Sequence, residues 1–413
     1  MKKRYIFSIL LFFFGISFIL IFSSSSSNTA RKPFGEPEII KPAQYQPTND
    51  DKAFLTLFEA YLEGAFIKTN TPGASLAIVK DGTVIYQKAF GVKSAGGKDS
   101  VDIDTRFRIA SVSKGFSAVL AGLVARDSLL CWDDNMIHYL KYPVQGKMKD
   151  ITIRNILSHT CGFQYQAYST LVEDELPRDA IISRLLTLKL SRHPGDIHSY
   201  QNVAYSLIEP ILESIYDRPF TELMTDQIFT PLGMSHTTIS YDSMINGVNV
   251  AMPHGYRRGA FVPATIKSSY YNVAAAGGIN SSISDMAQWL RAMLGYRPEV
   301  VPHEVLDQVF EPVISMRVKN PYFSQLYKPR SGYYGMGWRI IEYPEDTIIY
   351  HGGYANGYKS GIAFDRDKKI GICVLTNAPS KFSNLVLTQF FTMYNEYFEQ
   401  KKNFNGTDLV VMN

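Results

Sequence analysis

The sequence predicts an α+β protein in which strands from both ends of the chain form one antiparallel sheet and helices fill the middle. Two observations lead to this prediction. Short β-rich runs occur near residues 75–90 and again after Tyr334, whereas residues 113–300 show mostly helical periodicity broken by Gly and Pro. Strands that are separated from the helices in this way are typical of an antiparallel sheet with helices packed against it.

The first predicted elements are a helix and a hairpin. Phe54–Phe66 carries apolar residues at helical spacing. Ser75–Phe90 consists of two β-rich runs around Asp81-Gly82, a dipeptide that favours the positive φ angles of a type I′ turn.

Four further strands and a closing helix are expected after Tyr334. The strands are predicted over Gly335–Glu342, Thr347–His351, Tyr358–Phe364 and Ile370–Thr376, and the amphipathic helix over Phe382–Phe398. The helical middle, roughly residues 115–300, would then be an all-helical insertion between the two halves of the sheet.

The first 30 residues are typical of a signal peptide or a membrane anchor. Three basic residues precede Tyr5–Phe22, an apolar run longer than the usual signal core of about 7–15 residues and near the ~17–25 that span a bilayer. Small residues follow where a signal peptidase could cut, so both alternatives stay open. In either case we expect an exported, periplasmic or otherwise extracytoplasmic protein, held to the inner membrane only if residues 5–22 are retained.

The charge balance argues against nucleic acid as a partner. The formal net charge is +4, and Lys2, Lys3 and Arg4 supply most of it. Without these three residues, 39 basic side chains face 38 acidic ones, so the remaining chain is nearly neutral. Recognition of an anionic substrate must therefore depend on a few local groups.

Cysteine and histidine spacings indicate neither a disulfide framework nor a metal site. Cys131, Cys161 and Cys373 are an odd number at wide spacings, and we expect three small buried hydrophobes, with a single bridge left open. His193 and His198 are the only close histidine pair and flank a Pro-Gly turn, so loop positions are favoured over metal ligation. No cofactor is expected.

Ser111 and Lys114 form the only S-x-x-K sequence in the chain. On the first turn of a helix these two residues share a face. A desolvated, unprotonated lysine there can accept the hydroxyl proton of the serine and make it a nucleophile. The pair alone is a weak signal, because an N-cap serine beside a solvated lysine has the same spacing.

Ordered segments around this pair make the signal specific, because Phe107–Lys114 resembles the nucleophile segment of the class C β-lactamase and penicillin-binding-protein family of serine hydrolases. Further segments resemble that family in the same order: Pro72-Gly73-Ala74, Ile151–Gly162, Pro194-Gly195 with Tyr200-Gln201-Asn202, Ala275–Gly278 with Ser284–Ala287, Gly335–Trp338, and His351-Gly352-Gly353. The resemblance covers roughly residues 52–400 and implies the β-lactamase/transpeptidase-like fold, an antiparallel sheet flanked by helices plus an all-helical subdomain. Residues 31–51 would be a linker and 401–413 a tail.

The resemblance implies that Tyr200 and Asn202 form the second motif. Y-x-N also occurs at Tyr270/Asn272 and at Tyr354/Asn356, but only Tyr200 follows a Pro-Gly turn and opens a helical run. Tyr200 is expected to be a phenol whose pKa is lowered by the neighbouring lysine, so that it relays protons. Asn202 would bind the acyl-amide oxygen of the substrate and hold Lys114.

The third motif departs from true class C β-lactamases, which carry Lys-Thr-Gly where this chain has His351-Gly352-Gly353. His351 would face the cleft as a partly charged group for a substrate carboxylate. Gly353 would lack a side chain so that the strand can pair with the substrate backbone, and a mere hairpin turn at these glycines is the alternative. The oxyanion hole would consist of the backbone N–H groups of Ser111 and Tyr354.

Taken together, these features predict an exported serine hydrolase that forms an acyl-enzyme on Ser111, with Lys114 and Tyr200 as base. The expected partners are a β-lactam, a D-Ala-D-Ala peptide or an ester. Three activities stay open: a β-lactamase or D,D-peptidase, an esterase or D-aminopeptidase, and a penicillin-binding or sensor protein that acylates without turnover. Specificity is expected from residues 163–190 and 241–272.

Overall fold

A computed structural model describes residues 45–317 and 329–408. The predicted signal or anchor lies outside these ranges, as does most of the predicted linker. Within the described residues, no helix combines the length and the apolarity that a membrane span requires.

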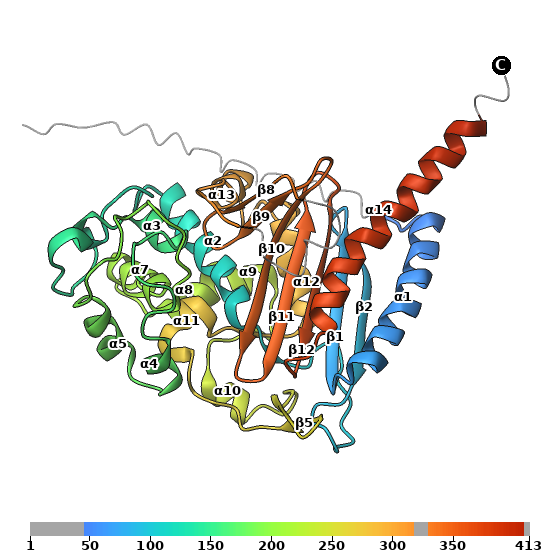
Figure 1. The fold of residues 1–413 in the computed structure, drawn as a ribbon, viewed down its shortest axis with the longest axis horizontal. Helices are drawn as coiled ribbons and strands as arrows, with labels where there is room; N and C mark the ends of the chain where they lie inside the picture. Colours follow the sequence, from blue (N-terminus) through green and yellow to red (C-terminus); the bar gives the residue numbers. More distant parts are fainter. Residues whose placement is uncertain (1–44, 318–328, 409–413) are drawn as a thin grey trace, which may run out of the picture. The chain divides into compact units, whose positions relative to one another are not determined.

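Eight antiparallel strands form one sheet, in the order β2-β1-β12-β11-β10-β9-β8-β7 (Figure 1). Their bounds are β1 (Gly73–Lys80), β2 (Thr83–Gly91), β7 (Ile314–Ser315), β8 (Ser331–Tyr334), β9 (Arg339–Glu342), β10 (Thr347–Ala355), β11 (Tyr358–Asp365) and β12 (Ile370–Thr376). The pairing of β1 with β12 confirms that the two ends of the chain build a single sheet. Asp81 and Gly82 have φ angles of 46° and 72°, as the predicted hairpin turn requires.

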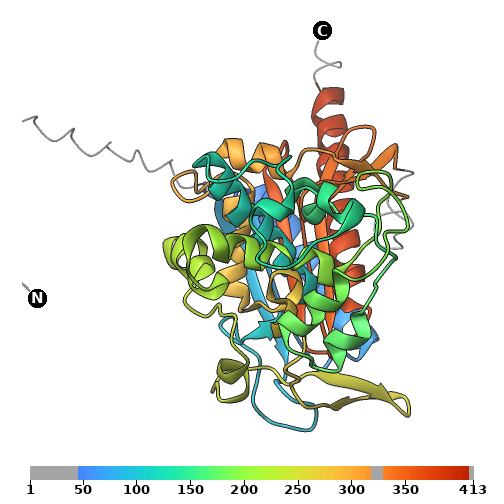
Figure 2. The same cartoon turned by 90° about the vertical axis from the view of Figure 1, so that its left-hand side faces the viewer.

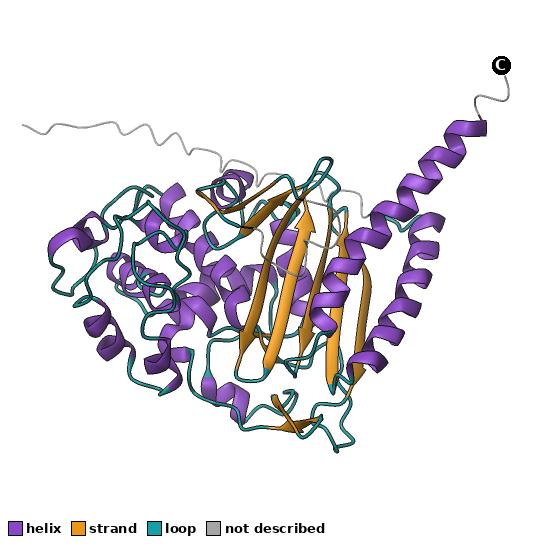
Figure 3. Ribbon diagram, viewed as in Figure 1, coloured by secondary structure: helices purple, strands orange, loops and turns teal. Residues whose placement is uncertain are grey.

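The sheet is buried on both faces because alternate side chains enter two different cores. In β1, Leu76 and Ile78 pack with helices α1 (Asn49–Thr69) and α14 (Phe382–Asp408), whereas Ala77 and Val79 join the larger core on the opposite face. This alternation follows from the two-residue period of a strand. Figure 3 shows the resulting layers of helix, sheet and helix.

Helices α1 and α14 are both longer than the sequence predicted. Thr48 caps α1 and forms a capping box with Asp51, so the helix begins at Asn49, inside the range assigned to the linker. Helix α14 continues to Asp408, well into the range assigned to a tail. The two helices lie side by side on one face of the sheet (Figure 1).

The opposite face of the sheet carries the inserted helices, which face the viewer in Figure 2. The helices against or near the sheet are α2 (Ser113–Arg126), α12 (Ile283–Met293) and α13 (His303–Val309). The remaining helices are α3 (Ile153–Leu157), α4 (Ser169–Glu173), α5 (Arg178–Leu185), α6 (Asn202–Tyr205), α7 (Ile208–Tyr216), α8 (Phe220–Met224), α9 (Thr230–Leu232), α10 (Tyr241–Ile245) and α11 (Ala274–Gly277).

The prediction of an all-helical insertion was wrong in one respect. A hairpin of β4 (His254–Arg257) and β5 (Ala260–Pro263) interrupts it, and β6 (Asn280–Ser281) pairs with β3 (Phe107–Arg108). The pairing of β6 with β3 ties the insertion to the segment that leads into α2.

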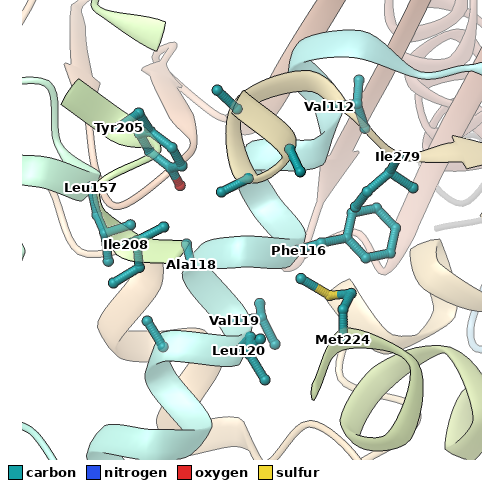
Figure 4. Close-up of a cluster of buried hydrophobic side chains, with 14 of the residues drawn as sticks. Val112, Phe116, Ala118, Val119, Leu120, Leu157, Tyr205, Ile208, Met224 and Ile279 are labelled. Atoms are coloured by element: carbon teal, nitrogen blue, oxygen red, sulfur yellow. The ribbon is translucent and has the colours of Figure 1, made fainter. Parts of the chain in front are cut away.

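Helix α2 lies in the centre of the larger core. Every residue from Ser113 to Val124 is buried, and its apolar side chains Phe116, Val119 and Leu120 contact neighbours from several helices (Figure 4). The Phe116 ring stacks on Trp289 of α12 with centroids 3.7 Å apart. This packing fixes the first turn of α2, which carries Lys114.

Candidate active site

Ser111 lies in a short 3₁₀ turn, η1 (Ala110–Val112), directly before α2. The preceding Ala110 has a φ of 49°, a left-handed conformation that costs a non-glycine residue roughly 1–2 kcal/mol. Two hydrogen bonds at Ile109 hold the turn: the Ser360 hydroxyl donates to its carbonyl at 2.6 Å, and its N–H donates to Ile279 O at 3.0 Å. The strain is therefore offset by anchoring to β11 and to the α11–β6 connection, as at many functional sites.

Lys114 Nζ makes three polar contacts and is fully buried. It lies 3.2 Å from Ser111 Oγ, 2.8 Å from Asn202 Oδ1 and 2.8 Å from the carbonyl oxygen of Ala276. A neutral amine has two N–H donors and one lone pair. The amide and carbonyl oxygens can only accept, so the lone pair is left for the Ser111 hydroxyl, which then donates to Nζ.

The surroundings of Lys114 favour that neutral form. Burial lowers its pKa well below the ordinary value, and the positive charge of Arg339 lowers it further. Among the described residues no carboxylate pairs with Lys114 to offset this effect. The predicted desolvated lysine is thus present next to the predicted nucleophile.

Tyr200 is in place, but its predicted pKa shift was wrong. Its ring lies 4.7 Å from Lys114 Nζ, and the interaction of its hydroxyl with the Ser111 side chain lowers its pKa. Burial raises the pKa of Tyr200 to about 12, because desolvation outweighs the lowering by the Arg339 charge. Tyr200 is therefore a neutral phenol, a donor and relay for protons rather than a phenolate.

His351 does not act as the expected cation. Its side chain is fully buried, and desolvation together with the charge of Arg339 holds its pKa well below the usual range. Its Nε2 lies 3.1 Å from Arg339 Nη1, which can only donate, and 3.1 Å from the Tyr334 hydroxyl. Nδ1 then carries the proton and donates to Gly352 O at 2.8 Å, so the imidazole is neutral with one fixed tautomer.

Arg339 is the cation that the sequence analysis missed. It follows the Gly335–Trp338 segment directly, which is the only signal that the sequence offered. On β9 it pairs with Tyr350 of β10, and its guanidinium lies 5.4 to 5.7 Å from the rings of Tyr200, Tyr334 and Tyr350. No carboxylate pairs with it in the described ranges, and it lines the same cleft as Ser111.

Gly353 has a packing role that the sequence did not predict. It lies inside β10 rather than in a turn, but a Cβ atom there would lie 2.3 Å from Ile109 O and 2.3 Å from Ser360 Oγ. The glycine thus lets β10 approach the nucleophile turn closely, and its predicted pairing with the substrate backbone stays a prediction. Gly352 has no atom nearer than 3.9 Å to such a position. Tyr354, the predicted second oxyanion donor, is 60% exposed and lines the cleft.

The cleft that contains Ser111 has a volume of about 1250 Å³. Both regions predicted to set specificity contribute to it, Tyr165 and Glu173 from the first and Tyr270 from the second. All three tyrosines of the Y-x-N sequences line it, although only Tyr200 is joined by an asparagine that contacts Lys114. Residues from β7 and the segment after it complete the wall and were not predicted.

The predictions on the cysteines have a mixed outcome. All three cysteines are free, and Cys161 and Cys373 are buried, but Cys131 is exposed, against expectation. In the part of the chain that the structure describes, no group of three potential ligands could hold a metal ion. His193 contacts Lys147 Nζ at 3.0 Å rather than His198.

The fold and the pairing of Ser111 with the buried Lys114 define the class of the protein, the serine β-lactamase and penicillin-binding-protein superfamily of serine hydrolases. The chain belongs to the Beta-lactamase family, whose model matches residues 54–388. This finding confirms the resemblance and the fold class that the sequence predicted.

Curated relatives and a solved structure agree with this assignment. Protein flp of Staphylococcus aureus (strain MW2) is 24% identical over 345 residues, which cover 81% of this chain and 65% of the relative. Unguisins hydrolase ungD' of Aspergillus campestris is 24% identical over 333 residues, 76% of this chain and 59% of the relative. This chain therefore spans less than two thirds of the length of either relative.

The structural neighbour shows the same fold. It is an octameric penicillin-binding protein homologue from Pyrococcus abyssi, with a TM-score of 0.72 and 22% identity. The match covers 82% of this chain and 77% of that chain.

Proposed function

We propose that this protein is a serine hydrolase that cleaves a β-lactam or D-Ala-D-Ala-type amide bond through an acyl-enzyme on Ser111. The observation that carries the proposal is the buried Lys114 amine, which contacts Ser111 Oγ and has its two other contacts on groups that only accept. A lysine that is desolvated at a cost in stability and aimed at a hydroxyl is an activated base.

The chemistry follows from these contacts. As the bond between Ser111 Oγ and the substrate carbonyl carbon forms, Lys114 takes the hydroxyl proton. The backbone N–H groups of Ser111 and Tyr354 would stabilise the oxyanion. Tyr200, a neutral phenol beside both side chains, would pass the proton to the leaving nitrogen as the C–N bond breaks, and water would then release the acyl group.

Substrate recognition would use the charge that lies in the cleft. Arg339 is a fixed cation with no carboxylate partner in the described ranges, and guanidinium groups bind carboxylates with two parallel hydrogen bonds. We assign to Arg339 the role that the sequence suggested for His351, binding of a carboxylate on the leaving side of the substrate. Asn202 would still contact the acyl amide.

A second candidate is a D-aminopeptidase, which one observation favours. Glu173 lines the cleft, accepts a hydrogen bond from Asn356 Nδ2 at 3.0 Å and has no Lys or Arg partner among the described residues. A carboxylate held in this way would attract a substrate with a free amino group. An esterase and a non-turnover penicillin-binding protein remain as alternatives of the same fold.

Intact-mass spectrometry after incubation with benzylpenicillin tests the proposal. We expect a transient adduct on the wild-type protein, loss of the adduct in Ser111→Ala, and the hydrolysed product in solution. A persistent adduct would instead identify a penicillin-binding protein without turnover. No adduct, together with no turnover of D-Ala-D-Ala peptides, D-amino-acid amides or nitrophenyl esters, would rule out the proposed nucleophile.

The cellular location belongs to the same proposal. The basic and apolar residues at the start of the chain support export, with the hydrolase on the outer side of the inner membrane. Fractionation of cells that express the full chain tests this, and activity confined to the cytoplasm would contradict it.

A further inference from the structure

Tyr200 is carried by a segment without regular secondary structure. Residues 191–201 form neither helix nor strand in the structure, and α6 begins only at Asn202. Loop segments are usually less precisely held than helices and strands. A phenol that must stay within hydrogen-bond reach of Ser111 therefore needs support from outside its own segment.

His159 supplies this support on both sides of Tyr200. Its carbonyl oxygen accepts a hydrogen bond from Ser199 N at 2.8 Å, and its Nδ1 accepts one from Gln201 N at 3.2 Å. The two donors are the immediate neighbours of Tyr200 in the chain. The imidazole also packs against the phenol ring with centroids 4.2 Å apart.

His159 is itself held firmly. It follows Ser158, the C-cap residue of α3, is 2% exposed and adopts a φ of 59°, which is uncommon for a residue other than glycine. The next residue extends the same support, because Thr160 O accepts from Gly195 N at 2.8 Å. Burial lowers the pKa of His159 well below its usual value, so Nδ1 stays an acceptor.

We propose that His159 is a positioning residue that fixes Tyr200 against Ser111 and Lys114 by binding the backbone on both sides of the phenol. The inference rests on the proposed function, since it assigns a catalytic purpose to the position of Tyr200. It also explains why a histidine, rather than another aromatic residue, occupies this turn: the ring must both pack against Tyr200 and accept a hydrogen bond from Gln201 N.

Two substitutions separate the acceptor from the rest of the side chain. In His159→Asn, the new side chain places its Oδ1 near the position of the histidine Nδ1, and asparagine tolerates the positive φ of this residue. His159→Gln carries the same amide one carbon further out, where it does not reach Gln201 N. Labelling of Ser111 by a fluorophosphonate, followed by intact mass, measures nucleophile activity without knowledge of the natural substrate.

We expect His159→Gln to slow labelling about tenfold to a hundredfold, the size of effect that a misplaced catalytic group produces. His159→Asn should largely preserve the rate. In a Tyr200→Phe background, His159→Gln should cause little further loss, because residues that act through one another are not additive. Hydrogen exchange of the 199–201 amides should rise in His159→Gln and stay near wild type in His159→Asn.

Other outcomes would overturn the inference. These are labelling of His159→Gln at the wild-type rate, an equal loss in His159→Asn, and a full additional loss in the Tyr200→Phe background. Failure of the proposed function is recognised separately, because labelling would then persist in Ser111→Ala. A Tyr200→Phe variant that labels normally would also overturn the inference, since positioning of Tyr200 would then have no effect on catalysis.

Discussion

Arg339 Nη1 lies 3.1 Å from His351 Nε2, so a guanidinium donates to a neutral imidazole. The positive charge on this wall of the cleft therefore belongs to Arg339 of β9, and not to His351 of the neighbouring strand β10. It also links substrate recognition to the base, because the same charge lowers the pKa of Lys114. Four experiments test these relationships and the close approach of β10 to the nucleophile turn.

Arg339→Gln should weaken binding of substrates that carry a carboxylate. A hydrogen bond to a charged group contributes about 1.5–3 kcal/mol, so KM for such a substrate should rise roughly tenfold to a hundredfold. KM for a neutral nitrophenyl ester should change little. Arg317→Gln is the matched control, because Arg317 lines the same cleft but is exposed. Equal effects of the two variants would contradict the assignment.

The pH profile should also respond to Arg339→Gln. The base works only when Lys114 is unprotonated, so kcat/KM falls as pH drops through the pKa of Lys114. Arg339 lowers that pKa, and its loss must raise it. With a neutral ester as substrate, the acid limb of the profile should therefore move to higher pH. A limb that stays in place or moves to lower pH would show that Arg339 does not act on the base.

His351→Lys should not restore the Lys-Thr-Gly type of site. The new ammonium would be buried close to Arg339, and an uncompensated buried charge costs several kcal/mol. We expect a clear decrease in Tm and weaker activity. His351→Gln, which keeps an acceptor for Arg339, should stay closer to wild type in thermal unfolding. A stable His351→Lys protein with raised β-lactam turnover would refute the neutral role of His351.

Gly353→Ala should destabilise the protein and slow acylation, because the added methyl would lie 2.3 Å from Ile109 O. Overpacking of this kind costs about 1–3 kcal/mol. Gly352→Ala is the control one residue away, where no atom lies within 3.9 Å, and its effect should stay within about 0.5 kcal/mol. Urea unfolding and fluorophosphonate labelling compare the two. Similar behaviour of both variants would mean that β10 is not tightly packed on the nucleophile turn.

The sequence predicted six of the eight strands of the sheet, because the signals of these six are local. It missed β7 and β8, and it started β9 at Gly335 instead of Arg339. The Asp81-Gly82 turn and the alternating runs after Tyr334 determine hairpins by their own conformational preferences. The S-x-x-K spacing likewise placed Ser111 and Lys114 on one turn. These features need no knowledge of distant segments.

The wrong predictions concern properties that depend on segments distant in the sequence. The pKa of Tyr200 and the charge of His351 depend on burial by the insertion and on Arg339, which comes from another strand. No motif or residue spacing in the sequence singled out Arg339, because it comes close to the cleft only through the pairing of β9 with β10. The electrostatic environment of a side chain depends on the assembled fold, and a short sequence motif contains little information about it.

The topology of the sheet also determines when the active site can form during synthesis of the chain. Strand β1 emerges early, yet its partner β12 is among the last segments of the described chain, and Ile109 beside the nucleophile is held by Ser360 of β11. Contacts so distant in sequence form late, because long loops must close first. A nascent chain that lacks its last strands therefore carries the serine and the lysine but not the walls that desolvate them, and reactivity would emerge only on completion of the polypeptide.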